Sequence, residues 1–416
     1  MKPMPDLLIL FLTRILRLFS YGLVSVILVI YLAGIGLSKA QIGLLLSLTL
    51  LGDVVVSLWI TLNADSFGRK RTLFLSSLLI VLAGVLFVVT NNFILLLLAA
   101  IIGVISPGGN EVGPFLPIEQ AALSQIVPDH SRTRIFAWYH LCGFFATALG
   151  SLFAGVIIRF ALNAGVSSLE SYRVIIILYA VLGVTLGVLF TQLSPGIETS
   201  VKNIVKAAQK HFGLHDSRSK VFKLSALFAV DAFGGGFILQ SIIAYWFYIR
   251  FQVDPVILGG IFFGMNILSG FSALLAARVA SRIGLVNTMV FTHLPSNFLL
   301  ILIPLMPSLP LAISVLLLRA VIAQMDVPTR QSYTMAVVRP DERSAAAGIT
   351  NIARSLGASA SPVLAVPLLA NAGLLNFPFF LAGGIKIVYD LMLYKWFKNI
   401  KPREEGIKNS LMEGIT

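Results

Sequence analysis

Ionisable side chains interrupt several long apolar stretches of this 416-residue sequence. A charge inside a hydrocarbon layer costs several kcal/mol unless it is paired or hydrated, so each of these residues is a candidate functional group. With a helical rise of about 1.5 Å per residue, Glu111 and Asp326 lie near the middle of their stretches. Arg17 and Arg354 lie close to the middle, and Asp231 lies nearer one end. We predict that these five residues contact a solute or exchange protons.

Helix-breaking residues accompany two of the carboxylates. Glu111 ends the run Ser-Pro-Gly-Gly-Asn-Glu that begins at Ser106, and Asp231 is followed by three glycines at 234–236. Glycine weakens a helix and lets a ligand or another backbone approach closely. Broken helices beside ionisable groups are typical of transporter sites. Close helix packing is the alternative explanation of these glycines.

The three carboxylates are candidates for coupling transport to protons, because a carboxyl group in a low-dielectric cavity can exchange a proton near neutral pH. Arg17 or Arg354 then supplies the counter-charge or contacts an anion. The arginines suit an anionic solute and the carboxylates suit a cationic one, so the charge of the solute stays open. Other ionisable residues of the apolar stretches are Arg14, Asp53, Glu119, His140, His293, Arg319, Lys386 and Asp390.

Metal binding and enzymatic chemistry have little support in the sequence. His140 and His293 could join Asp231, Asp326 and Met325 around a metal ion, but they lack the close spacing of metal ligands. A phosphate-binding glycine loop with its lysine and a nucleophile elbow are both absent from the sequence. We therefore predict no enzymatic activity and no cofactor or resident metal, and we keep metal-cation transport as a lesser alternative.

The composition requires a membrane. Hydrophobic residues make up 57% of the chain and charged residues 12%, against roughly 45–50% and 25% in soluble domains. The formal net charge of +13 comes mostly from short loops, where membrane orientation explains it better than nucleic-acid binding. We predict a monomeric multi-pass protein of the cell (inner) membrane, in contact with lipid and without a nucleic-acid partner.

Twelve stretches are long enough to cross a bilayer as helices of about 20 residues. Their expected limits are 7–33, 41–62, 71–90, 93–126, 135–160, 173–193, 222–249, 256–280, 285–305, 310–338, 344–370 and 377–397. An even number places both termini on one side of the membrane. Basic residues concentrate in the loops of that side, so the positive-inside rule predicts that both termini are cytoplasmic.

A long polar connection and an internal repeat divide the chain into halves. We predict an N-terminal six-helix bundle (1–193), a cytoplasmic linker with an amphipathic helix (194–221), a C-terminal six-helix bundle (222–397) and a cytoplasmic tail (398–416). The run Pro-Ile-Glu-Gln at 117–120 corresponds to Pro-Thr-Arg-Gln at 328–331. Two copies in the same orientation indicate parallel repeats about an axis along the membrane normal.

The loop after the second stretch carries the most specific motif. Residues 63–71 read Asn-Ala-Asp-Ser-Phe-Gly-Arg-Lys-Arg, which resembles the D-x-x-G-R-K/R-R signature of the major facilitator superfamily. The resemblance implies an all-α membrane protein with twelve transmembrane helices in two pseudo-symmetric six-helix bundles. It also implies transport of a small molecule by alternating access. The G-x-x-x-G-P pattern of drug/proton antiporters is absent from the fifth stretch, so the direction of transport stays open.

The same resemblance implies a conformational latch at this loop. Gly68 permits a tight turn, Arg69 and Arg71 lie at the cytoplasmic surface, and Asp65 faces the positive end of the eleventh helix near Ser344. Positive charge that sets membrane orientation would explain Lys70 and Arg71, but it leaves Asp65 and Gly68 unexplained.

From these features we predict a secondary active transporter of a small-molecule solute that works by alternating access and is coupled to protons. A non-transporting membrane receptor or scaffold with the same fold is the alternative. The latch motif and the intramembrane charges argue against it, because a static scaffold needs neither.

Overall fold

The computed structural model describes residues 5–198, 217–339 and 342–400. These residues form helices joined by short connections and contain no strand. The chain divides into two compact units, neither of which is one continuous stretch of sequence. The first unit contains residues 1–210, 238–267 and 362–375, and the second contains residues 211–237, 268–361 and 376–416.

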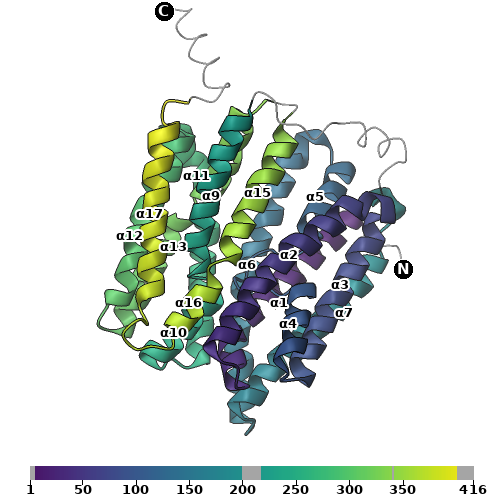
Figure 1. The fold of residues 1–416 in the computed structure, drawn as a ribbon. Coiled ribbons are helices and arrows are strands. Elements are labelled where there is room, and N and C mark those ends of the chain that lie inside the picture. The colour runs from purple at the N-terminus through teal and green to yellow at the C-terminus, as the bar shows by residue number, and fades with distance from the viewer. Residues whose placement is uncertain (1–4, 199–216, 340–341, 401–416) are drawn as a thin grey trace, which may run out of the picture. The chain divides into compact units, whose positions relative to one another are not determined.

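The first unit holds most of the N-terminal half (Figure 1). Its helices are α1 (Asp6–Gly34), α2 (Lys39–Phe67), α3 (Arg69–Val89), α4 (Phe93–Ile102), α5 (Phe115–Ile126), α6 (Asp129–Asn163), α7 (Ser168–Thr191), η1 (Pro195–Ile197), α10 (Gln240–Phe251) and α16 (Pro362–Leu368). One further helix, α11 (Pro255–Ile283), begins in this unit and ends in the second.

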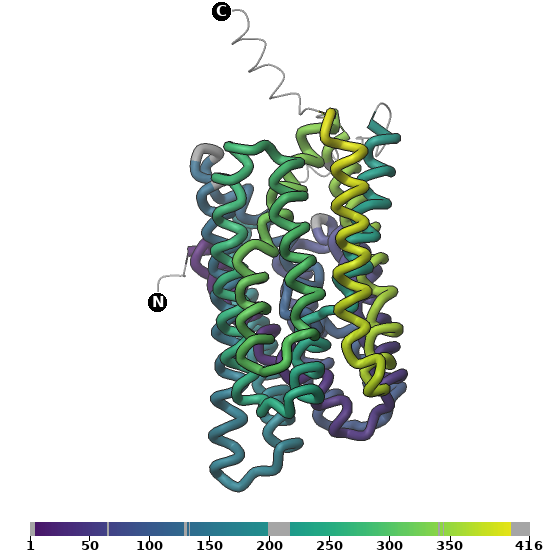
Figure 2. The backbone as a smooth tube through the Cα atoms, turned by 90° about the vertical axis from the view of Figure 1, so that its left-hand side faces the viewer, coloured from purple at the N-terminus to yellow at the C-terminus, as the bar shows by residue number. Residues whose placement is uncertain are grey.

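The second unit is built from the remaining helices of the C-terminal half. They are α9 (Arg218–Gly236), α12 (Leu285–Leu302), η2 (Ile303–Leu305), α13 (Leu309–Ala323), α14 (Asp326–Val337), α15 (Arg343–Ser359) and α17 (Phe377–Phe397). Figure 2 shows α17, in yellow, as one unbroken helix.

Ten helical stretches of the described chain are long and apolar enough to cross a bilayer. They coincide with ten of the twelve predicted stretches. The fourth, predicted at 93–126, is divided into α4 and α5, and the eleventh, predicted at 344–370, is divided into α15 and α16.

Helix interruptions lie beside all three predicted carboxylates. Glu111 lies in the irregular segment 103–114 between α4 and α5, where Gly109 and Gly113 have φ of 69° and 82°. Asp231 lies in α9, which ends at the glycine triplet, and Asp326 is the first residue of α14. A side chain beside an irregular segment is less covered by its own helix, so each carboxylate can meet partners from several helices.

The broken fourth stretch is held by side chains of its neighbours. Asp53 of α2 accepts a hydrogen bond of 2.6 Å from the Gly113 N–H, and the Tyr179 hydroxyl of α7 donates one of 2.6 Å to the carbonyl of Val104. Irregular backbone at membrane depth requires such partners, since lipid offers none. Asp53 is thus a partner of the backbone.

Segments of the C-terminal half are bonded into the first unit. The Gln240 amide donates to the hydroxyl of Ser25 in α1 at 2.8 Å, and the Val363 N–H donates to the hydroxyl of Ser47 in α2 at 2.9 Å. Gln240 is buried. These polar contacts tie the start of α10 to α1 and the start of α16 to α2.

Glycines let α1 and α6 pack with their backbones in contact. A Cβ atom at Gly150 of α6 would overlap the carbonyl oxygen of Phe19 in α1, and a Cβ atom at Gly22 would overlap that of Thr147. This close approach positions the α1 arginines against the middle of α6. The proline of the G-x-x-x-G-P pattern, which α6 lacks, is not needed for this packing.

We expect Gly150→Ala to lower the thermal stability of the purified protein, because an inserted methyl group in a packed contact costs about 1–3 kcal/mol. Gly384→Ala in α17 is the matched control, since a Cβ atom there meets nothing within 4 Å. Alanine forms helix better than glycine, so the control should be neutral or stabilising. Equal melting temperatures for the two variants would contradict the close contact of α1 and α6.

Candidate functional site

A group of buried charges joins α1, the broken fourth stretch and α6. We call it the first charged cluster, and its members are Arg14, Arg17, Glu111, Glu119, Tyr139 and His140. Arg17 has no exposed side-chain surface. It donates to both oxygens of Glu119, at 2.7 and 2.6 Å, and through Nε to Glu111 at 2.9 Å. One guanidinium therefore bridges two carboxylates, which uses the fork geometry that arginine offers.

Arg14 completes the pairing of Glu111. Its Nη1 donates to Glu111 Oε2 at 2.8 Å, and its guanidinium lies over the ring of Tyr139 at 4.5 Å. A second nitrogen lies 3.5 Å from Nδ1 of His140. Glu111 thus binds two arginines, yet 15% of its side chain is exposed. It is the accessible carboxylate of this cluster.

Glu119 is enclosed. Its side chain has no exposed surface, and it accepts from the Tyr139 hydroxyl at 2.5 Å and from Thr13 at 3.4 Å in addition to Arg17. A carboxylate with this many donors is stabilised as a structural anchor. The cluster holds two arginines and two glutamates, so it is neutral when His140 is neutral.

A second group of buried charges surrounds α9. We call it the second charged cluster, and its members are Asp231, His293, Arg319, Asp326, Arg330, Arg354, Lys386 and Asp390. Asp231 lies at its centre with 4% of its side chain exposed. It accepts from Lys386 at 2.6 Å, from Arg330 at 3.2 Å and from Arg354 at 3.4 Å. Three cations therefore share one carboxylate.

Asp326 pairs within its own helix. Its Oδ2 accepts from Nη1 of Arg330 at 2.8 Å, one turn along α14, and both side chains are buried. The same nitrogen of Arg330 also reaches Asp231. Arg330 thereby connects two of the predicted site residues, as Arg17 does in the first charged cluster.

A histidine connects the two aspartates of α9 and α17. His293 Nδ1 lies 2.9 Å from Asp390 Oδ1, and its Nε2 lies 3.8 Å from Asp231 Oδ1. Asn297, one turn along α12, donates to the other oxygen of Asp390 at 2.9 Å. The carboxylate of Asp390 fixes the orientation of the imidazole ring.

The glycine triplet of α9 accommodates a lysine. A Cβ atom at Gly234 would lie 3.0 Å from Cγ of Lys386, whose ammonium group reaches Asp231. At Gly236 a Cβ atom would overlap the carbonyl oxygen of Ala358 in α15. These glycines therefore permit packing of α9 against α15 and α17, which is the alternative that the sequence left open.

The predicted latch loop makes contacts within the first unit. Gly68 has a φ of 92° between α2 and α3, as a tight turn requires. The N–H groups of Arg69 and Lys70 donate to the carboxylate of Glu198 at 2.7 and 3.1 Å. The Arg69 guanidinium donates to Gln125 at 2.9 Å. Glu198 therefore neutralises the positive N-terminal end of α3.

The other two predicted latch residues lie on either side of this turn. Asp65 belongs to the end of α2, and Arg71 is exposed in the first turn of α3. The contact of Asp65 with the eleventh helix stays a prediction. The amphipathic helix expected in the linker lies largely outside the described residues, as does the cytoplasmic tail beyond residue 400.

The sequence predicts five residues that contact a solute or exchange protons. The structure places Arg17 and Glu111 in the first charged cluster, and Asp231, Asp326 and Arg354 in the second. It adds Arg14, Glu119, Arg330 and Lys386 as their direct partners. Arg330 had a signal in the sequence, because it occupies the repeat position of Glu119. Lys386 had none beyond its place in an apolar stretch, since its partner is on a distant helix.

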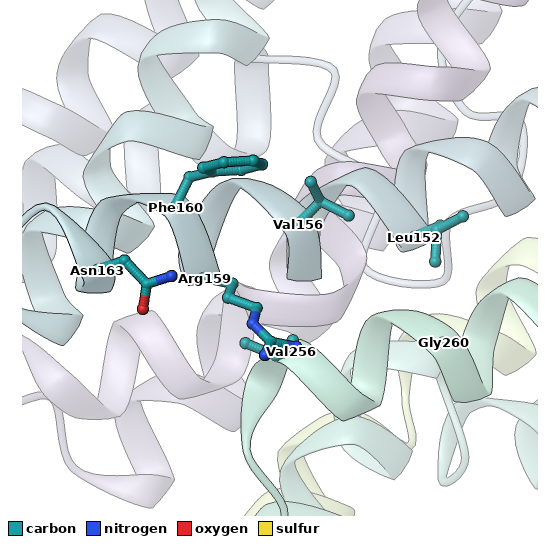
Figure 3. Close-up of a pocket in the computed structure, with 7 residues that line it drawn as sticks. All are labelled: Leu152, Val156, Arg159, Phe160, Asn163, Val256 and Gly260. Atoms are coloured by element: carbon teal, nitrogen blue, oxygen red, sulfur yellow. The ribbon is translucent and has the colours of Figure 1, made fainter.

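A pocket of about 250 Å³ lies in the first unit, between α6 and the start of α11 (Figure 3), and no member of either charged cluster lines it. Its lining residues are Leu152, Val156, Arg159, Phe160, Asn163, Val256 and Gly260. Figure 3 shows Phe160 and Val156 projecting from α6, with Arg159 directed toward Val256. None of the residues predicted to contact solute lines it.

Comparisons with known proteins extend over nearly the whole chain. A family model described as Major Facilitator Superfamily matches residues 10–362. The membrane protein YJR124C of Saccharomyces cerevisiae is 30% identical over 424 residues, which covers 95% of this chain and 94% of the yeast protein.

Solved structures share the fold at low sequence identity. A bacterial homologue of the human lysosomal transporter Spinster, in an inward-facing and occupied conformation, matches with a TM-score of 0.71 and 16% identity over 93% of this chain and 95% of its own. The xylose transporter XylE of E. coli, in an inward-open conformation, matches with a TM-score of 0.73 and 14% identity over 96% and 98%. These matches and the observed helices confirm the predicted all-α membrane fold.

Proposed function

Because this chain belongs to the major facilitator superfamily, we propose that it is a secondary active transporter that uses a proton gradient to move its solute. Family membership makes the chain a multi-pass membrane protein that transports a small solute by alternating access, and not an enzyme. Coupling to protons is the proposed part. The observation that carries it is the pairing and exposure of Glu111.

Glu111 combines three properties that a coupling carboxylate needs. It lies in the irregular segment of a broken membrane stretch, it is partly exposed, and it forms ion pairs with both Arg14 and Arg17. A proton on Glu111 removes one negative charge from a neutral cluster and leaves an arginine without a full partner. Such a change in buried charge pairing alters the relative stability of two conformations.

The other predicted carboxylates support the proposal less directly. Asp231 and Asp326 have 4% and 5% of their side chains exposed, against 15% for Glu111. Both are held by Arg330, so a proton reaches them only after this pairing opens. We therefore assign coupling to Glu111, with Arg17 as its counter-charge.

Orientation is also part of the proposal. Basic residues of the loop at 69–71 and of the segment before α15 support a cytoplasmic position for both termini by the positive-inside rule. This position places Glu198 and the N-terminal end of α3 at the cytoplasmic face. Cleavage of a terminal tag by a protease added to the outside of intact cells would contradict this orientation.

Glu111→Gln is expected to uncouple solute movement from protons. In liposomes that contain the wild-type protein, an imposed pH gradient should accelerate uptake of a transported solute from a broad compound panel. The variant should retain exchange of labelled for unlabelled solute. Its rate of gradient-driven uptake should fall by a factor of about ten or more, because an amide cannot take up the coupled proton. Wild-type flux that ignores the pH gradient would overturn proton coupling.

A further inference from the structure

The second charged cluster contains more basic than acidic side chains. Its carboxylates are Asp231, Asp326 and Asp390, and its basic side chains are Arg319, Arg330, Arg354 and Lys386. With His293 neutral, one positive charge remains in excess among the described residues. The Nε of Arg319 is buried and has no hydrogen-bond partner in the described part of the chain. An excess cation inside a membrane protein is unfavourable, so an anion that enters this cluster would be stabilised.

Arg354 is the most exposed of the basic side chains that contact Asp231. Protein atoms leave 30% of its side chain uncovered, against 4% for Asp231 and 6% for Arg330. An intramembrane arginine faces a water-filled space or the interior of the bundle and avoids lipid. Its contact with Asp231, at 3.4 Å, is also the longest that this aspartate accepts.

Asp231 can release Arg354 without becoming unpaired. Lys386 at 2.6 Å and Arg330 at 3.2 Å remain on its two oxygens. A guanidinium that turns from this shared carboxylate to a free oxyanion gains a partner that it does not share. The exchange therefore favours an incoming carboxylate or phosphate group, which the planar fork of arginine binds through two hydrogen bonds.

The first charged cluster also contains a buried Nε without a hydrogen-bond partner in the described part of the chain, that of Arg14, but both of its arginines are buried. Arg17 is fully buried and its three nitrogens donate to Glu111 and Glu119. That cluster is electrically neutral, so an anion entering it would meet two glutamates. Of the two arginines that the sequence placed near the membrane centre, Arg354 is therefore the one free to bind an anion.

From the excess charge and the partly exposed side chain of Arg354 we infer that the transported solute is anionic and that Arg354 binds its carboxylate or phosphate group. The inference rests on the proposed transport function and names the chemical class of its solute. Lys386 and Arg330 act as positioning residues, because they hold Asp231 when Arg354 turns to the solute.

The test measures binding and transport with defined probes. Succinate, glutamate and inorganic phosphate serve as anions, choline as a cation and glucose as a neutral solute. Wild-type protein in detergent should be thermally stabilised by at least one of the anions, and liposomes should accumulate the same compound. We expect Arg354→Met to bind this anion roughly tenfold to a hundredfold more weakly. Arg354→Lys should lie between the two, since it keeps the charge and loses the fork.

Arg282→Met is the matched control, because it removes the same charge from an exposed position at the end of α11. It should bind the anion as the wild type does. If Arg354→Met does not fold, weaker binding by Arg354→Lys carries the test. Unchanged anion binding in the folded Arg354 variants, or wild-type stabilisation by none of the three anions, would overturn the inference. Proton-driven uptake of choline or glucose would overturn it while leaving the proposed function intact.

Discussion

Arg17→Met is expected to destabilise the protein by about 3–5 kcal/mol, because removal of one partner from a buried ion pair leaves the other charge uncompensated. Glu119 has no exposed surface and would keep only Tyr139 and Thr13 as partners. The effect is measured by thermal unfolding of the purified protein in detergent, monitored as the loss of monodisperse elution from a size-exclusion column.

Two further variants separate pairing from packing. The double variant Arg17→Met with Glu119→Gln removes both charges and leaves Glu111 paired with Arg14, so most of the lost stability should return. Arg173→Met removes a cation from the more exposed pair with Glu170, and its effect should be about 0–1 kcal/mol. A double variant as unstable as the single one would show that the charge of Glu119 is not the cause.

Asp231→Asn is expected to reduce transport by roughly 100-fold or more, which corresponds to about 3 kcal/mol. The substitution removes the carboxylate on which Lys386, Arg330 and Arg354 converge. These three cations would then repel one another, and the excess positive charge of the second charged cluster would double. Solute uptake into liposomes at matched protein content measures the loss.

A second substitution tests whether repulsion causes this loss. Lys386→Met in the Asp231→Asn background removes the ammonium group that donates to Asp231 in the wild-type protein. We expect the double variant to recover thermal stability but not transport, since Arg354 would still lack the carboxylate that holds it between transport events. Full transport by Asp231→Asn alone would contradict the central position of this residue.

The sequence was informative about single helices and much less so about pairs of helices. Apolar length located the membrane stretches, and the run from Ser106 to Glu111 marked the break between α4 and α5. The pair of Asp326 with Arg330 was also accessible, because residues four apart lie on one face of a helix. These features depend only on residues close together in the chain.

The charge partners across helices could not be read in the same way. Lys386 and Asp390 are also four residues apart, yet Lys386 binds Asp231 of α9 and Asp390 binds His293 of α12. Which of these pairs forms depends on how α9, α12 and α17 are rotated against one another. That rotation follows from glycine contacts such as Gly234 against the stem of Lys386, which the chain alone does not specify.

The corresponding positions of the internal repeat have opposite charges, Glu119 in α5 and Arg330 in α14. In each unit the residue of opposite charge lies on the first long helix. Arg17 of α1 pairs with Glu119, and Asp231 of α9 pairs with Arg330. The pairing of the first long helix with the repeat position is therefore present in both units with its charges exchanged. A change of sign at one member of either pair would leave two like charges in contact inside the protein, so the charges can be exchanged only by substitutions in both helices.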